Sequence, residues 1–178
     1  MPALSGRLGL SSMLQDNFWQ QKRLSEMTQQ EWEAICDGCG KCCLNSFIDS
    51  EDEEDEFAPT DTLRDGEEII FTNIACQYLD SSACSCTNYE NRQRLVPSCV
   101  KLTKDNLKDI FFMPQSCSYR RLHEGRGLAS WHPLNHNGDK TAMHDAGISV
   151  KDKVVKDNEV NLDNFQDYIA TWPTFDKD

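Results

Sequence analysis

The sequence predicts an α+β fold: a small single domain of mainly short helices and loops with a small antiparallel hairpin, organised around its cysteines. Three observations lead to this prediction. Helix start signals are followed closely by helix breakers, so the helices should be short. Two short β-favouring stretches flank a long acidic run. Nine cysteines occur in a chain of 178 residues that is only 38% hydrophobic, so groups other than apolar side chains are expected to help hold the domain together.

The clearest helix signal is a capping box at Thr28 and Glu31. The Thr28 hydroxyl can accept a backbone N–H while the Glu31 carboxylate reaches back to the cap. The helix that it opens leads directly into CDGCGKCC, residues 36–43. Other helices are expected after Asp16, after Thr103, from Cys117 to Gly125, and over Leu162–Ile169.

A hairpin is predicted from Leu44–Ile48 and Ile69–Asn73, which are short and rich in β-favouring residues. The segment between them, 49–68, contains eleven acidic residues and one basic residue, Arg64. We expect a solvated acidic loop insertion here, since DSEDEEDEF lacks the spaced ligands and central glycine of an EF-hand. The net charge of -12 repels phosphate backbones, so no nucleic-acid partner is expected.

The domain is predicted to span residues 16–175, preceded by a flexible N-terminus at 1–15. The sequence shows no secretory signal pattern and no stretch of about 20 apolar residues, so we expect a cytoplasmic protein without membrane contact. Thiols stay reduced in that compartment. A dense cysteine pattern there favours metal binding or redox chemistry over a disulfide framework.

The strongest motif is Cys36-x2-Cys39-x2-Cys42-Cys43. Two intervening residues let a pair of thiolates reach one metal in a tight turn, and the two glycines of the motif permit the positive φ that such a turn needs. Three cysteines at this spacing also resemble the run that supplies an iron–sulfur cluster, so the spacing leaves both zinc and iron open. Adjacent Cys42 and Cys43 project differently. One of them is expected to join Cys36 and Cys39, while the other serves a second site or packs.

Five later cysteines are candidates for the remaining metal ligands: Cys76, Cys84, Cys86, Cys99 and Cys117. Together with the motif they could fill two four-coordinate sites, or one cluster with a few structural thiols left over. The alternative is that a free cysteine is simply a small buried hydrophobe, which has most weight for Cys99 and Cys117 taken singly.

Histidine offers weaker candidates. His132 and His144 could be metal ligands or acid–base groups because imidazole titrates near neutral pH, although a structural role is favoured for both. His123 and His136 are expected on the surface. Gly-rich phosphate loops, G-x-S-x-G elbows and HExxH motifs are absent from the sequence.

The motifs also resemble a known family. CDGCGKCC, FTNIACQYLD, CSCTNYENR, VPSCVKLT, MPQSCSYRRLHEG, WHPL and HDAGISV occur in the order that marks the YcgN-like proteins, an uncharacterised bacterial family with a CxxCxxCC-type zinc- or iron-chelating domain. The resemblance runs from about Phe18 to Trp172, and the main departure from the family pattern is the acidic insertion at 49–68.

This resemblance implies a cysteine-rich metal-binding protein that chelates zinc or iron, with an iron–sulfur cluster as one form of the cofactor. The metal-ligand set that it implies comprises Cys36, Cys39, Cys42, Cys43, Cys76, Cys84, Cys86, Cys99 and Cys117. A related cysteine pattern occurs in flagellin lysine methylases. The resemblance therefore leaves open a metal- or iron–sulfur-dependent enzyme in redox or group-modification chemistry, without naming a substrate.

Overall fold

The longest strands form the predicted antiparallel hairpin. In the computed structural model, which describes residues 14–49, 63 and 66–173, β1 (Leu44–Asp49) pairs antiparallel with β2 (Glu68–Ala75). The register shifts between Leu44 and Ser46, which marks a bulge near the start of β1. Residues 1–13 of the predicted flexible N-terminus and residues 50–62 and 64–65 of the predicted acidic loop lie outside the described residues.

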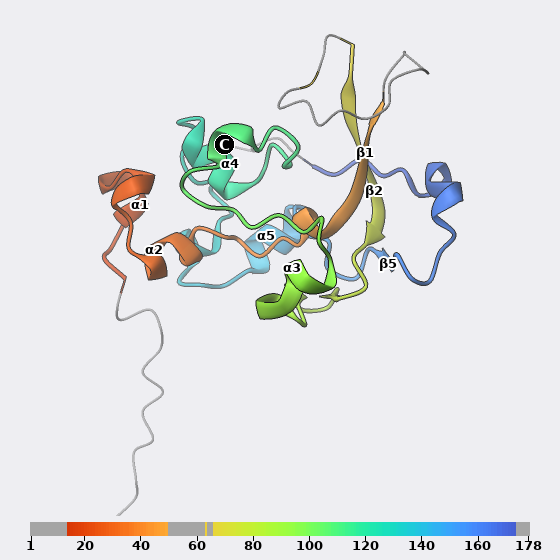
Figure 1. Cartoon of the computed structure of the whole chain (residues 1–178). Helices are drawn as coiled ribbons and strands as arrows, with labels where there is room; N and C mark the ends of the chain where they lie inside the picture. Colours follow the sequence, from red (N-terminus) through yellow and green to blue (C-terminus); the bar gives the residue numbers. More distant parts are fainter. Residues whose placement is uncertain (1–13, 50–62, 64–65, 174–178) are drawn as a thin grey trace, which may run out of the picture.

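Short strands complete the α+β architecture. β5 (Val155–Lys156) pairs in parallel with the end of β2, giving the order β1-β2-β5. β3 (Leu79–Asp80) and β4 (Ser85–Cys86) form a separate antiparallel pair. In Figure 1 the hairpin and β5 lie at one side of the molecule, and the first two helices lie at the other.

The helices are short, as predicted. The α-helices are α1 (Phe18–Gln21), α2 (Gln29–Ala34), α3 (Arg92–Leu95), α4 (Ser118–His123) and α5 (Thr141–Asp145). Single 3-10 segments cover Leu24–Glu26, Lys41–Cys43, Tyr89–Asn91, Leu107–Asp109, Pro133–His136 and Leu162–Tyr168. Within the described ranges, no helix combines the length and the apolar character needed to cross a bilayer.

Two of the predicted helix boundaries are confirmed. The Thr28 hydroxyl accepts from the Glu31 N–H at 3.2 Å, and the Glu31 carboxylate accepts from the Thr28 N–H at 2.8 Å, so the capping box forms in full. α4 ends before Gly125, which has φ +75° and provides the left-handed residue expected there.

Other local predictions differ from the structure. The first helix has Asn17 at its N-cap position, one residue after the expected cap Asp16, and Leu24 lies in a separate turn. The helix expected after Thr103 is reduced to the single turn Leu107–Asp109. The Asn106, Asp109 and Met113 N–H groups each donate to the carbonyl three residues back, so the segment forms successive turns in place of a continuous α-helix.

Two further segments are less regular than expected. The helix predicted over Leu162–Ile169 is a 3-10 segment interrupted at Asn164. The extended piece predicted at Gly147–Val150 is a loop after α5, which the Val150 N–H joins to the Cys39 carbonyl at 2.9 Å.

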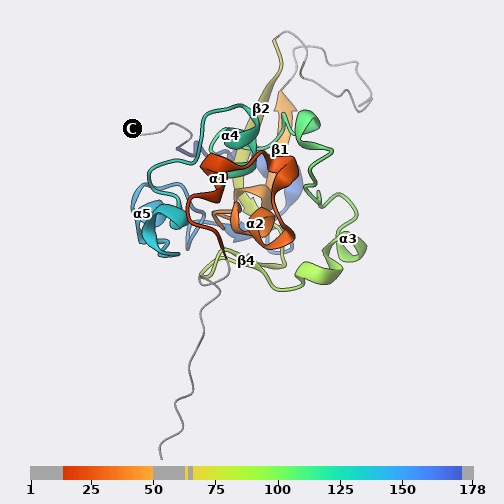
Figure 2. The same cartoon turned by 90° about the vertical axis from the view of Figure 1, so that its left-hand side faces the viewer.

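Apolar side chains form three separate clusters. The first contains Phe18, Met27, Trp32, Ile35, Leu107, Ile110, Met113, Cys117 and Tyr119; the second Leu44, Ala75, Leu79, Cys84, Val150 and Trp172; the third Cys39, Ala129, Trp131, Met143 and Ile148. The segment 35–44 contributes to all three, through Ile35, Leu44 and Cys39 respectively. The cysteine motif therefore lies where the three clusters meet. In Figure 2, α2, which precedes the motif, lies near the middle of the molecule, with α3 and α5 toward opposite edges.

Gly40 provides a test of this junction. Its φ is +79°, and an added Cβ would lie 2.6 Å from Val150 Cγ2, whereas Gly125 has φ +75° with no atom within 4 Å of the same position. Gly125→Ala should lower the free energy of unfolding by about 1 kcal/mol, because an L-residue is strained in the left-handed conformation. Gly40→Ala should cost clearly more because the clash adds to the same backbone term. Urea unfolding of the reduced, metal-free variants measures both losses, and equal losses would contradict the close packing at Gly40.

Candidate metal centre

The cysteine motif forms a tight turn between α2 and β1. Gly38 and Gly40 adopt φ of +73° and +79°, as the motif predicts. The Asp37 carboxylate accepts from the Cys39 N–H at 2.8 Å, and this hydrogen bond between two residues of the turn stabilises it. Lys41–Cys43 then form a single 3-10 turn that enters the hairpin.

Buried hydrogen bonds attach Cys117 to this turn from both sides. Asp37 accepts from the Ser118 hydroxyl at 2.7 Å, and the Lys41 ammonium donates to the Ser116 hydroxyl at 2.6 Å. None of these four partners is more than 4% exposed. Both sequence neighbours of Cys117 are therefore held by residues that lie between the cysteines of the motif.

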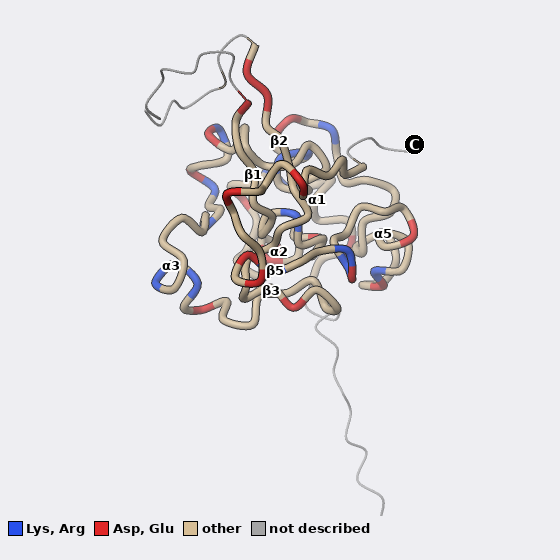
Figure 3. Tube along the Cα trace, turned by 90° about the vertical axis from the view of Figure 1, so that its right-hand side faces the viewer, with Lys and Arg blue, Asp and Glu red and all other residues tan. Residues whose placement is uncertain are grey.

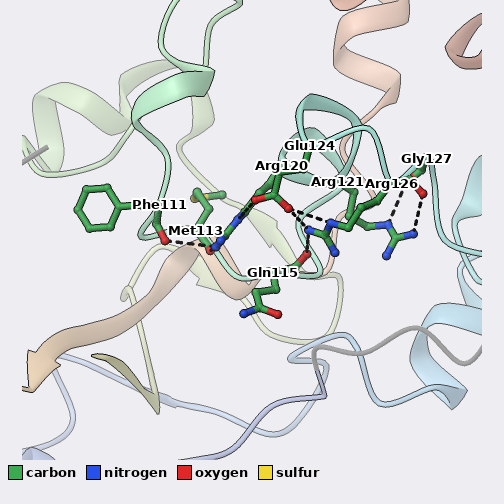
Figure 4. A network of polar contacts seen from close by, with 8 residues as sticks. All are labelled: Phe111, Met113, Gln115, Arg120, Arg121, Glu124, Arg126 and Gly127. Carbon is green, nitrogen blue, oxygen red and sulfur yellow. Dashed lines mark hydrogen bonds and ion pairs between the residues drawn. The ribbon is translucent and has the colours of Figure 1, made fainter. Parts of the chain in front are cut away.

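A second network fixes the approach to α4 (Figure 4). Arg120 donates to the Met113 carbonyl at 2.6 Å and pairs with Glu124 at 2.7 Å. Arg126 also pairs with Glu124, and it donates to the Gln115 carbonyl at 2.7 Å. These contacts tie the loop before α4 to the helix itself and so fix the start of α4.

A first group of thiols comprises Cys36, Cys39, Cys42 and Cys117. The charge of an ionised Cys42 would raise the pKa of the other three thiols and that of Cys99. A hydrogen bond with the neighbouring Cys43 raises the pKa of Cys42, an exposed residue, well above its ordinary value.

Burial is the main cause of the raised pKa at the other thiols of this group. It raises the pKa of Cys36 to about 12 and that of Cys117 to about 11, with smaller contributions from Asp37 and Cys42. The pKa of Cys39 is also raised well above its ordinary value, first by burial and then by Asp37. Cys36 is an exposed residue, whereas Cys117 is buried.

A second group of thiols adjoins the first. Burial raises the pKa of Cys76 and of Cys99, and the nearby Cys86 raises both a little more. Cys99 senses Cys42 as well and therefore links the two groups. The backbone joins them too, since the Cys76 N–H donates to the Cys43 carbonyl at 2.8 Å.

Cys84 packs beside Gly40 of the motif, where an added Cβ would lie 3.6 Å from Cys84 Cβ. It is 5% exposed, adopts φ +52°, and packs in the second apolar cluster with Leu79 and Val150. Burial raises its pKa, and the charges that modify this effect come from lysines 140 and 151 and from Asp152. Electrostatic interactions thus connect Cys42 with Cys36, Cys39, Cys43, Cys99 and Cys117, and Cys86 with Cys76 and Cys99. The complete ligand set stays a prediction, and Cys84 is the member that these interactions support least.

The donor chemistry fits a soft metal. Thiolates suit zinc and iron–sulfur centres. Within the described ranges, no three His, Cys, Asp or Glu side chains already have the spacing of ligands to one ion. Trp131 supplies a further observation, since its indole N–H is buried without a hydrogen-bond partner in the described part and packs in the cluster of Cys39. A metal-bound thiolate is an acceptor that could use such a donor.

The histidine candidates have structural contacts. His132 is fully buried; its Nδ1 accepts from the Leu134 N–H at 3.0 Å, so its Nε2 carries the proton and donates to the Ile35 carbonyl at 2.9 Å. Burial lowers the pKa of His132 and keeps the ring neutral. His144 shares a hydrogen bond with the Ser149 hydroxyl. His123 and His136 are exposed, which confirms the surface location predicted for them.

Sequence reasoning missed the residues that hold Cys117 in place. Asp37 and Lys41 are the only charged residues of CDGCGKCC, and Cys117 is flanked by serine on both sides. Charged residues inside an otherwise small and apolar turn were the available signal, because such groups are buried only with partners.

Comparison with known proteins assigns the chain to a class. The family described as "Putative zinc- or iron-chelating domain", of the CxxCxxCC type, matches residues 35–118. A UPF0260 protein of Allorhizobium ampelinum is 44% identical over 161 residues, which cover 90% of this chain and 92% of the relative. A UPF0260 protein of Shewanella oneidensis is 47% identical over 161 residues, covering 90% and 99%. No solved structure matches the chain.

The chain therefore belongs to the UPF0260 family, whose relatives match it over nearly their whole length. The predicted resemblance to an uncharacterised bacterial family with a CxxCxxCC domain is confirmed.

The raised thiol pKa values predict how the stability of the metal-free protein depends on pH. Below the ordinary cysteine pKa of 9.0, Cys117 is protonated in both the folded and unfolded states, so its contribution to stability is complete. As pH rises, the unfolded chain ionises first, and stability falls from about pH 9 through about pH 11.

Urea unfolding with chelator and reductant at several pH values from 8 to 11 measures this loss. Cys117→Ala removes one of the titrating thiols, so its stability should fall less steeply over the same range. A wild-type protein whose stability stays constant to pH 11, or falls with the same slope as the variant, would contradict the buried, protonated state of Cys117.

Proposed function

We propose that this chain is a metal-binding protein in which cysteine thiolates hold zinc or iron, the latter as an iron–sulfur cluster if sulfide is present. One observation carries the proposal: hydrogen bonds hold Cys117 and Cys76 against the 36–43 turn. We place Cys42 at the centre of the ligands because its charge acts on Cys36, Cys99 and Cys117. The family's description as a zinc- or iron-chelating domain supports the same class of function.

The two groups of thiols suggest how the ligands are divided. Cys36, Cys39, Cys42 and Cys117 would form one ligand group. Four further cysteines would form the other: Cys43, Cys76, Cys86 and Cys99. On this proposal Cys42 and Cys43 both take part, in different groups, which uses the different directions of adjacent side chains.

The bound metal would supply cohesion between the three apolar clusters. Each cluster is small, and the segment that joins them also carries four of the thiols. Because a structural site forms only in the folded chain, the free energy of binding the metal becomes free energy of folding. The proposal requires reduced thiols, as are found in the cytoplasm.

Lys41 provides charge compensation for these thiolates. Its ammonium is 1% exposed, and its positive charge favours the ionised form of Cys39. Burial lowers the pKa of Lys41, while Cys39, Asp37 and Cys117 oppose this effect. The serine and the Pro173 carbonyl that accept its hydrogen bonds hold the ammonium in place.

The enzymatic alternative lacks a comparable observation. It would use His132 or His144 to transfer protons near the metal. Both ring nitrogens of His132 are committed to backbone groups, and His144 Nδ1 is engaged by Ser149. We therefore propose binding alone as the function of this centre.

The test is the metal and acid-labile sulfide content of protein purified without oxygen, together with its visible spectrum. We expect stoichiometric metal in the wild type, strong loss in Cys42→Ala, and wild-type content in Cys84→Ala, which serves as a matched control for removal of a buried thiol. Colourless protein with zinc indicates chelation of the ion alone, whereas brown protein with near-equal iron and sulfide indicates a cluster.

Wild-type protein that holds neither zinc nor iron would contradict the proposed function. Equal metal content in Cys42→Ala and wild type would contradict the central position given to Cys42.

A further inference from the structure

Residues 169–173, which we call the C-terminal strap, join β2 to the cysteine motif. Ile169 forms an antiparallel bridge with Thr72, and the Ala170 N–H donates to the Phe71 carbonyl at 3.0 Å. In Figure 1 this blue end of the chain crosses β2. The C-terminal strap therefore begins as a short backbone pairing with β2.

Trp172 is the main contact of the C-terminal strap with the domain. It is buried in the second apolar cluster, which contains Leu44 and against which Cys43 packs. Its indole Nε1–H donates to the Thr72 carbonyl at 3.2 Å. One side chain thus places the C-terminal strap in the apolar cluster at the end of the motif and bonds it to β2.

Lys41 joins the C-terminal strap to the interior of the motif. Its ammonium donates to the Pro173 carbonyl at 3.0 Å and to the Ser116 hydroxyl at 2.6 Å. Figure 3 shows basic residues at an edge of the molecule, at α3, whereas Lys41 is only 1% exposed. The C-terminal strap and Ser116 therefore hold the same buried cation, which lies in the sequence between two cysteines of the motif.

The end of the chain has few other buried contacts. Within 161–173, Trp172 is the only buried residue, and Leu162 and Ile169 are 49% and 52% exposed. Segments with few buried contacts can open locally while the rest of the domain stays folded. The C-terminal strap could open in this way, because the first and third apolar clusters contain none of its residues.

We propose that the C-terminal strap controls metal exchange: when docked it closes the motif at Lys41 and Cys43, and when undocked it lets metal enter or leave there. The inference rests on the proposed function. Two observations carry it, namely the hydrogen bond from Lys41 to Pro173 and the burial of Trp172 in the cluster against which Cys43 packs. Metal is then released mainly through the undocked state.

The test measures the transfer of metal from the purified holoprotein to excess EDTA. Trp172→Ala should release metal at least about tenfold faster than wild type, because it removes the main buried contact of the C-terminal strap. Trp172→Phe keeps a ring but loses the N–H donor, and its rate should lie between the two. Trp19→Ala is the matched control, since Trp19 packs against the first apolar cluster at α1, far from the hairpin in Figure 1. Its release rate should be close to that of the wild type.

Hydrogen exchange of the wild-type holoprotein tests the opening itself and needs no variant. The Ala170 N–H and the Trp172 indole N–H should exchange faster than the amides of the β1–β2 ladder, because the C-terminal strap opens while the domain stays folded. Equal protection of the C-terminal strap and the ladder would mean that both open together, and would overturn the proposal.

Equal release rates in Trp172→Ala and Trp19→Ala would also overturn it. If Trp172→Ala does not fold, Trp172→Phe and the exchange measurement decide. In all these cases the wild type would still hold metal. Failure of the proposed function would be seen separately, as wild-type protein without metal.

Discussion

The arrangement depends on the two buried hydrogen bonds that flank Cys117. Asp37 with Ser118 and Lys41 with Ser116 join the 36–43 turn to the start of α4, and all four side chains are shielded from water. Buried bonds that involve a charged partner contribute more than neutral ones, and leaving such a charge unpaired is costly. The turn is thus held in one position relative to Cys117. Since the segment 35–44 also contributes to each apolar cluster, the same contacts orient the rest of the domain.

In this arrangement several thiols are buried, and a buried thiol ionises readily only if a positive charge lies nearby. Burial keeps Cys39 and Cys117 protonated in the metal-free protein, and their neighbours Asp37 and Cys42 act in the same direction. The positive charge of Lys41 opposes this effect at Cys39. A bound metal would supply the remaining positive charge, which explains how a chain with small apolar clusters could gain stability from thiols that otherwise only pack.

Local features of the fold could be predicted from the sequence, and distant pairings could not. The capping box at Thr28 and the hairpin were predictable because each depends on neighbouring residues or on a short alternating pattern. The helix expected after Thr103 was wrong, since the segment forms successive turns in which each N–H donates to the carbonyl three residues back. The motif predicted a cysteine centre. It could not reveal that Asp37 reaches a serine 81 positions away, or that Cys84 faces an apolar cluster while Cys86 lies with the thiols, since spacing alone does not show direction.

X-ray absorption at the edge of the bound metal, on protein purified without oxygen, tests most directly whether this junction of cysteines is a metal centre. A first shell made only of sulfur is predicted, at about 2.3 Å if the metal is zinc. A first shell of nitrogen and oxygen atoms would contradict the account, because it would place the metal away from the thiols gathered around Cys42.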